Sequence, residues 1–141
     1  ILAQSAAPAP LHKEVINEGM NAVKRIAEAL ELFGLLTLEA FVTVDGKLLF
    51  NEIAPRPHNS FHWTIEGCAT SQFAQLARLL AGMPFGATHT YGNWQMDNLL
   101  GEDMWKLPDL LTSASTHVHL YGKADAKTGR KMGHTNRLIC S

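Results

Sequence analysis

Two glutamates, Glu39 and Glu52, flank an Asp-Gly pair at 45–46. The segments beside the pair, 35–44 and 47–53, are rich in aliphatic and β-branched residues, which predicts two strands joined by a tight β-hairpin turn. With a two-residue loop, all cross-strand pairs have the same sum of residue numbers, which places Glu39 directly opposite Glu52. Directly opposite side chains share one face of the sheet, with Cβ atoms about 4.5–5.5 Å apart.

Two carboxylates placed in this way repel each other, unless a cation neutralises them or one of them takes up a proton. Mg²⁺ accepts carboxylate oxygens and keeps positions open for substrate phosphates, so the pair could hold a nucleotide-bound metal. In the alternative, the register slips at a bulge and one glutamate reaches solvent at the sheet edge. The two-residue loop also pairs Thr43 with Leu48 and Phe41 with Phe50. It directs Asn51 to the opposite face, so a metal or phosphate role for Asn51 requires a local twist.

A second group of possible ligands is basic and lies near the C-terminus. Four cations surround a predicted turn at 127–129, namely Lys123, Lys127, Arg130 and Lys131. Such a group suits a phosphate monoester, although a solvated charged surface is the commoner reason for a cluster of this kind. Arg56 stands between two prolines, which would hold its guanidinium fork on an extended loop, but most arginines are simply exposed.

The elements that must position these residues follow from hydrophobic periodicity and from breaker residues. Apolar residues at helical spacing predict a core-packing helix over residues 11–33, ended by Gly34, and a second helix over 64–80, closed by Gly82 and Pro84. The remaining expectations are an extended breaker at 6–10, a loop at 54–62, a strand ending at 98–101, a helical turn at 103–111 and a strand at 117–121. The fold class is therefore α+β, with both helices packed on one side of an antiparallel sheet and a small β-rich C-terminal lobe.

Composition sets limits on the partners. The 141 residues are 46% hydrophobic with a net charge of −1, which is enough for a real core and gives no basic field for nucleic acid or an anionic membrane. No apolar run is long enough to span a bilayer. The two cysteines, Cys68 and Cys140, fit unpaired thiols in a reducing cytoplasm. The first five residues lack an initiator Met and a basic segment, so we expect the middle of a longer chain rather than a signal peptide.

The segment NEIAPRPHNS at residues 51–60 resembles the signature of the N5-carboxyaminoimidazole ribonucleotide synthase family, which has an ATP-grasp fold. Further matches in the same order are HWT at 62–64, TSQF at 70–73, NLLG at 98–101, HLYGKA at 119–124 and GRKMGH at 129–134. The resemblance covers nearly the whole chain. It implies the C-terminal part of an ATP-grasp domain at residues 1–86, followed by a β-rich lobe at 87–141.

The resemblance also implies a reaction in which 5-aminoimidazole ribonucleotide, bicarbonate and ATP give N5-carboxyaminoimidazole ribonucleotide, ADP and phosphate through carboxyphosphate. ATP and Mg²⁺ would be the cofactors, and the full-length parent a cytoplasmic homodimer. The implied metal ligands are Glu39 and Glu52, with Asn51 and Glu52 also at the nucleotide. The other implied roles are catalysis for Arg56 and His58, and substrate binding for Asn59, Ser60, Lys123, Arg130 and Lys131. His62 is a second choice, and His89, His117 and His119 are expected to be structural.

Phe61 departs from the family pattern, which usually has glycine there. Glycine would suit a positive φ or a close approach of the backbone to a ligand, and a phenylalanine opposes both. The family's N-terminal domain and its ATP-gripping lid are also absent, so we expect no catalysis from the isolated chain. Two alternatives remain open at this stage: another ATP-grasp ligase on the same scaffold, or a degenerate module that binds nucleotide without turnover.

Overall fold

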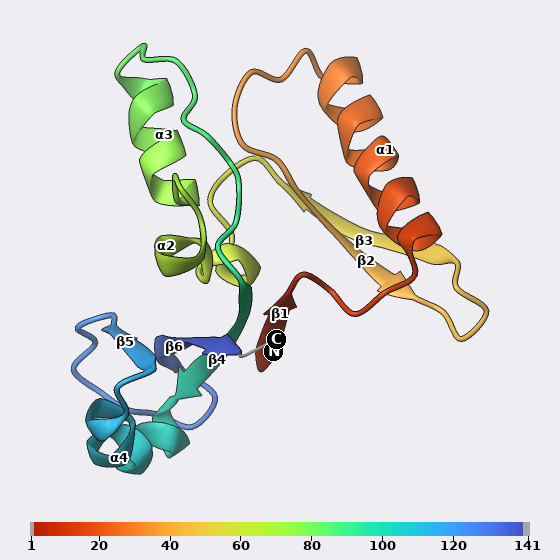
Figure 1. Ribbon diagram of the computed structural model, residues 1–141. Helices are drawn as coiled ribbons and strands as arrows, with labels where there is room; N and C mark the ends of the chain where they lie inside the picture. The colour runs from red at the N-terminus through yellow and green to blue at the C-terminus, as the bar shows by residue number, and fades with distance from the viewer. Residues whose placement is uncertain (1, 140–141) are drawn as a thin grey trace. The chain divides into compact units, whose positions relative to one another are not determined.

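The computed structural model describes residues 2–139, which fall into two compact units. One unit, here the sheet unit, is drawn from Ile1–Pro8, Asn59–Ser71 and Ala87–Ser141, and the other, the hairpin unit, from Ala9–His58 and Gln72–Gly86. The chain therefore alternates between the units along its length (Figure 1). The expected division after residue 86 coincides with the last change of unit.

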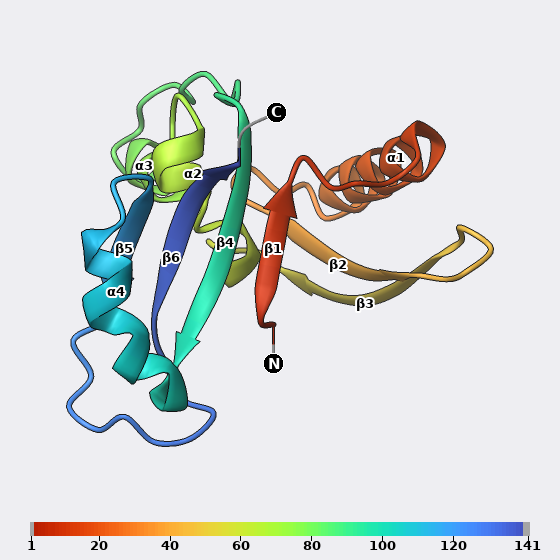
Figure 2. The ribbon, with the colours of Figure 1, turned by 60° about the horizontal axis from the view of Figure 1, so that its bottom comes forward.

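The sheet unit is built on an antiparallel sheet with the strand order β1-β4-β6-β5 (Figure 2). Its strands are β1 (Gln4–Ala7), β4 (Asn93–Leu100), β5 (Thr116–Leu120) and β6 (Lys131–Ile139). The 3₁₀ helix η2 (Gly101–Lys106) and helix α4 (Leu107–Thr112) connect β4 to β5, which confirms the predicted helical turn. Strand β1 pairs with β4 and was not predicted; only its last two residues overlap the expected breaker at 6–10.

Trp63, Trp94 and Met96 form a buried cluster in the core of the sheet unit. Trp63 follows the 3₁₀ helix η1 (Asn59–Phe61) and leads into the short helix α2 (Thr64–Gly67). Gly67 lies against both tryptophans, because a Cβ atom there would come within 2.7 Å of Trp63 Cε3 and 2.8 Å of Trp94 Cδ1. The predicted helix over 64–80 is wrong as one element. Cys68 after Gly67 is extended and bridges Thr90, so the chain leaves the helix at that point.

The second half of the expected helix is α3 (Gln72–Leu80) in the hairpin unit. It ends as predicted at Gly82, which has a φ of 65°. The Gly82 amide donates to the Leu79 carbonyl and the Met83 amide donates to the Arg78 carbonyl. These two hydrogen bonds form a Schellman motif, in which the left-handed glycine satisfies the last carbonyls of the helix.

Helix α1 (Lys13–Ala29) lies along the hairpin of β2 (Thr37–Val42) and β3 (Leu48–Ala54) (Figure 1). Its half-buried residues recur at helical spacing, at Val15, Gly19, Ala22, Val23, Ile26 and Ala27. No residue of α1 is fully buried, so this helix is less of a core element than its pattern predicted. It ends at Glu31, with a φ of 48°, rather than at Gly34. The Glu31 and Leu32 amides bond to the Glu28 and Ala27 carbonyls, so a Schellman motif forms without glycine.

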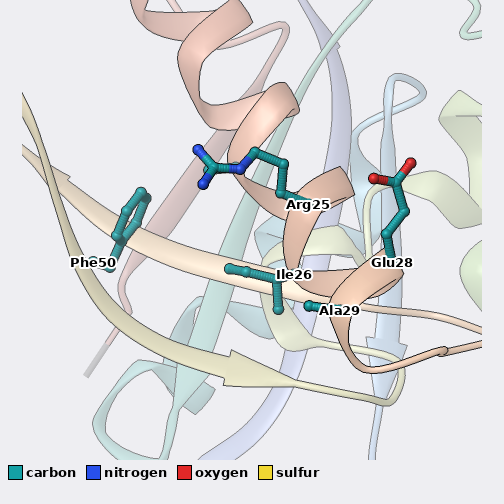
Figure 3. Close-up of a pocket in the computed structure, with 6 residues that line it drawn as sticks. Arg25, Ile26, Glu28, Ala29 and Phe50 are labelled. Carbon is teal, nitrogen blue, oxygen red and sulfur yellow. The ribbon is translucent and has the colours of Figure 1, made fainter.

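A groove of about 650 Å³ lies between α1 and β3. In Figure 3, Ile26 and the ring of Phe50 point into it from the helix and the strand, and Glu28 turns away.

No helix among residues 2–139 is long and apolar enough to span a membrane. Cys68 is a free thiol, and burial raises its pKa. Cys140 lies outside the described residues.

Candidate functional site

Glu39 and Glu52 pair directly across β2 and β3, as predicted, although the predicted loop is wrong. Thr43 and Lys47 are bonded to each other, since the Thr43 amide donates to the Lys47 carbonyl at 2.9 Å. The loop therefore has three residues and ends with Gly46 at a φ of 80°. A three-residue loop with a left-handed last residue is a common hairpin turn.

This longer loop shifts the register by one residue near the turn. Phe41 faces Leu49 rather than the predicted Phe50, and Leu48 faces Val42 rather than Thr43. A register shift between Glu39 and Ala40 then restores the original pairing. The extra residue on β3 is Asn51, because Glu52 and Phe50 face these two consecutive residues of β2.

The bulge also explains how Asn51 can lie beside the carboxylates. Strict alternation would have sent its side chain to the opposite face. Instead, Asn51 Nδ2 lies 3.5 Å from Glu39 Oε2, at the outer limit of a hydrogen bond. The local irregularity that a metal or phosphate role for Asn51 requires is therefore present.

Glu39, Glu52 and His58 form the one group of three metal-type ligands found among residues 2–139. One ligand atom from each lies within 4.8 Å of the others, and Glu39 Oε1 is 3.2 Å from His58 Nε2. His58 is buried, Glu39 is half-buried and Glu52 is exposed. Two carboxylates that converge with one side open suit a hard divalent cation that keeps positions for other oxygen ligands. The donor set therefore fits Mg²⁺, which the carboxylates of Glu39 and Glu52 could hold.

His58 is held by the side chain of Gln72, at the start of α3. The His58 amide donates to Gln72 Oε1 at 2.7 Å, and Gln72 Nε2 donates to the His58 carbonyl at 2.9 Å. Both residues are buried. The two bonds fix the backbone of the loop at His58, whose ring lies beside Glu39. Arg56 on the same loop is exposed, and its guanidinium donates to the Pro57 carbonyl at 3.1 Å.

A second polar cluster, in the sheet unit, brings together Asn59, Asn98 and Lys131. The two asparagine amides exchange hydrogen bonds of 2.9 and 2.7 Å, and Lys131 Nζ donates to Asn59 Oδ1 at 2.8 Å. Asn98 is buried, whereas Asn59 and Lys131 are half-buried. The structure thus joins two of the predicted substrate-binding residues directly.

The remaining predicted phosphate ligands lie around the start of β6. Lys123 Nζ donates to the Lys131 carbonyl at 2.6 Å and lies 5.6 Å from the centre of the Tyr121 ring. Arg130 is exposed and donates to the Asp125 carbonyl at 3.3 Å. The predicted turn is present, since the Arg130 amide bonds to the Lys127 carbonyl. Ser60 accepts a hydrogen bond through its carbonyl from Ser5 Oγ.

Three histidine rings, those of His62, His119 and His134, lie close together near Tyr121. The rings of His119 and His134 are stacked with centres 4.6 Å apart, and the His62 ring lies 4.8 Å from that of His134. Burial, together with the two neighbouring histidines, lowers the pKa of His134 to about 3. Tyr121 Oη lies 2.9 Å from His134 Nδ1, and burial raises the pKa of this tyrosine. His134 is therefore neutral at physiological pH.

Glu66 connects the same region to the chain near His62. It lies 2.7 Å from His119 Nε2 and accepts a hydrogen bond of 2.6 Å from Asn136 Nδ2. Asn136 Nδ2 also donates to the His62 carbonyl at 3.0 Å. These contacts give His119 and the His62 backbone a structural role.

Phe61 does not have the backbone conformation that would demand glycine. Glu31 has a positive φ, and no other non-glycine residue of the described chain does. Phe61 is 41% exposed, and its backbone carbonyl accepts a hydrogen bond from Thr64 Oγ1. The departure from the family pattern therefore requires no left-handed backbone at residue 61.

Sequence reasoning gave no role to Gln72 or Asn98, although both stand in segments that carried the resemblance, at 70–73 and 98–101. Each is a buried amide that bonds to a predicted site residue. Their residue type was the one signal in the sequence that could have identified these two positions. A polar amide in an otherwise apolar segment needs a partner when it is buried.

A model of the ATP-grasp domain matches residues 1–73, and a model described as the phosphoribosylaminoimidazole carboxylase C-terminal domain matches residues 95–139. The chain belongs to the ATP-grasp family. It is 45% identical over 138 residues to N5-carboxyaminoimidazole ribonucleotide synthase of Brucella melitensis, an alignment that covers 98% of this chain and 38% of that protein. The resemblance read from residues 51–60 is therefore confirmed.

Solved structures agree with this placement and confirm the α+β fold class. The ADP complex of an N5-carboxyaminoimidazole ribonucleotide synthetase is 42% identical, with a TM-score of 0.92, over 99% of this chain and 37% of that one. The Aspergillus clavatus enzyme, in complex with ADP and 5-aminoimidazole ribonucleotide, is 33% identical with a TM-score of 0.86, over 100% of this chain and 40% of that one. The chain thus spans well under half of these relatives.

Proposed function

We propose that this chain is the C-terminal part of an ATP-dependent N5-carboxyaminoimidazole ribonucleotide synthase of purine biosynthesis. The complete protein would convert 5-aminoimidazole ribonucleotide, bicarbonate and ATP into N5-carboxyaminoimidazole ribonucleotide, ADP and phosphate. Bicarbonate would first become carboxyphosphate, whose carbon the exocyclic amine of the ribonucleotide then attacks. The relatives described above support this assignment by their names and by their bound ligands.

The convergence of Glu39, Glu52 and His58 carries the proposal. Phosphoryl transfer to bicarbonate spreads negative charge over several oxygens, and catalysis depends on positioned charges rather than on a protein nucleophile. Mg²⁺ would supply charge neutralisation at the ATP phosphates. Glu39 and Glu52 would hold the metal, and Asn51 would keep Glu39 oriented through its amide.

The other residues are assigned by their chemistry and by the family resemblance. Arg56 offers an exposed guanidinium fork that can bind carboxyphosphate with two hydrogen bonds. His58 lies beside Glu39 and can orient the same intermediate through its ring. The ribonucleotide would be bound by Ser60, Lys123, Arg130 and Lys131, and Asn59 would contribute through its hydrogen bond to Lys131. A cytoplasmic homodimer is the corresponding proposal for the complete protein.

The decisive test is ADP release by the complete protein. We expect release that depends on both bicarbonate and 5-aminoimidazole ribonucleotide, and loss of that release in the Glu52→Gln variant. Glu14→Gln, at an exposed position of α1, is the matched control and should behave as the wild type does. Equal turnover of an acceptor without a phosphate would assign a different ATP-grasp ligase. ADP binding without turnover would assign a degenerate module.

A further inference from the structure

Asn98 is a buried amide in β4 whose hydrogen bonds connect this strand to the two other segments of the sheet unit. Its amide group exchanges two hydrogen bonds with Asn59. The same Nδ2 also donates to the Leu2 carbonyl at 2.8 Å, and its backbone amide donates to the Ala3 carbonyl at 2.8 Å. These backbone contacts fix the orientation of the Asn98 side chain, since an amide flip would break the bond to Leu2.

The Asn59 side chain is committed to protein partners. Its Oδ1 accepts from Asn98 Nδ2 and from Lys131 Nζ, which uses both lone pairs of a carbonyl oxygen. Its Nδ2 donates to Asn98 Oδ1, and its side chain is also hydrogen-bonded to Tyr121. Asn59 is therefore an acceptor for the lysine rather than a group that faces outward to a ligand.

Lys131 gains a fixed position from this arrangement. A lysine side chain has many rotamers, and ordering it on binding a phosphate costs conformational entropy. The Asn59 amide oxygen orients the ammonium group, and because an amide is uncharged this bond does not neutralise the positive charge. The orientation of that oxygen is set in turn by Asn98.

We propose that Asn98 is a positioning residue, which acts through Asn59 to hold the Lys131 ammonium ready for the phosphate of the ribonucleotide. The inference rests on the proposed function for the identity of the ligand. The positioning itself rests only on the hydrogen bonds among these three residues.

A double-mutant cycle in the complete protein tests whether Asn98 acts on ribonucleotide binding through Lys131. Calorimetry with 5-aminoimidazole ribonucleotide should give a dissociation constant about tenfold higher for Asn98→Ala and higher still for Lys131→Met. The double variant should bind no more weakly than Lys131→Met alone, because Asn98 acts only through the lysine. Additive losses, or unchanged binding by Asn98→Ala, would overturn the proposal.

Two controls separate positioning from general damage. The dissociation constant for ADP should stay within about twofold of the wild-type value in every variant. Gln95→Ala, which removes an amide from the same strand that bonds to Asp97, should leave ribonucleotide binding unchanged. The nearly isosteric Asn98→Asp variant replaces Asn98→Ala if the latter does not bind ADP. Its carboxylate cannot donate to Asn59 Oδ1, so it too should weaken ribonucleotide binding.

A second readout does not depend on the ribonucleotide. In Asn98→Ala, acylation of the Lys131 amine by an amine-reactive reagent, followed by mass spectrometry, should be about threefold faster than in the wild type. An unchanged labelling rate would contradict the positioning role even where the wild type binds no ribonucleotide. Failure of wild-type ribonucleotide binding alone would instead contradict the proposed function.

Discussion

Glu39 and Glu52 lie directly opposite each other because two one-residue irregularities in the hairpin cancel. The three-residue loop moves β3 by one position relative to a two-residue turn, and the additional residue Asn51 moves it back. The pairing of the carboxylates is thus the same as in a regular hairpin, but the irregularity near Asn51 leaves an amide beside them. A regular hairpin would have lacked this third polar group.

The Glu39→Gln variant should weaken metal use more than it weakens folding. The substitution keeps the shape of the side chain but removes one of two charges that suit a divalent cation. In the complete protein, the Mg²⁺ concentration for half-maximal ADP release should rise by about tenfold or more, which is about 1.4 kcal/mol of binding free energy. A Mg²⁺ titration that matches that of the wild type would exclude Glu39 as a ligand.

Gln72 and Gln75 offer a matched pair on the same helix. Gln75 bonds to the amide and the carbonyl of Gly86, just as Gln72 bonds to those of His58. Substitution of either by leucine should destabilise the protein by about 1–3 kcal/mol for each buried group left unsatisfied. Only Gln72→Leu should also lower kcat, by about tenfold or more, because it frees the loop that carries His58. Equal kcat losses in both variants would show that the effect is general.

Burial of neutral His134 should make stability depend on pH. The pKa of about 3 in the folded protein lies below the usual 6.5, so the unfolded chain binds a proton more readily. The contribution of neutral His134 to the free energy of unfolding is complete above pH 6.5. It is lost as the pH falls from 6.5 toward 3. Between pH 7 and pH 5 it amounts to about 2 kcal/mol.

Chemical denaturation at both pH values measures this difference. His134→Gln should remove about 2 kcal/mol of the pH dependence. His89→Gln, at an exposed histidine, serves as the matched control and should retain the wild-type dependence. If the His134 variant loses as much stability as the wild type between the two pH values, the buried ring is not the source.

Two glycines in the helices should respond to alanine in opposite directions. Gly67→Ala forces a methyl group against Trp63 and Trp94, so it should destabilise the protein by about 1–3 kcal/mol. Gly19→Ala places its methyl group 3.6 Å from Leu48 Cδ1, an ordinary contact, and should stabilise α1 by about 0.5–1 kcal/mol. Denaturation midpoints measure both. A neutral Gly67→Ala would mean that the tryptophans can move apart.

The sequence was most informative where local patterns decide the structure. The periodicity of α1, the hairpin around Gly46 and the glycine end of α3 depend on nearby residues, and each could be predicted. The break at Cys68 could not, because it depends on a bridge to Thr90, twenty-two residues away in sequence. Strand β1 was missed for the same reason, since its partner is β4.

In the candidate site, too, contacts between residues close in sequence could be predicted and contacts between distant residues could not. Glu39 and Glu52 come together through hairpin geometry alone, so their pairing could be predicted from residue numbers. Asn59, Asn98 and Lys131 lie far apart in sequence and meet only through the sheet, so their mutual bonds could not be predicted. The family resemblance named two of them but gave no role to Asn98.

The interleaved course of the backbone means that neither unit can be made as one uninterrupted polypeptide. An expression boundary after residue 86 would separate β4 from β1, its neighbour in the sheet, and would separate Trp94 from Trp63. Expression of the sheet unit by itself therefore requires its three segments to be joined by linkers, in their native order or in a permuted one.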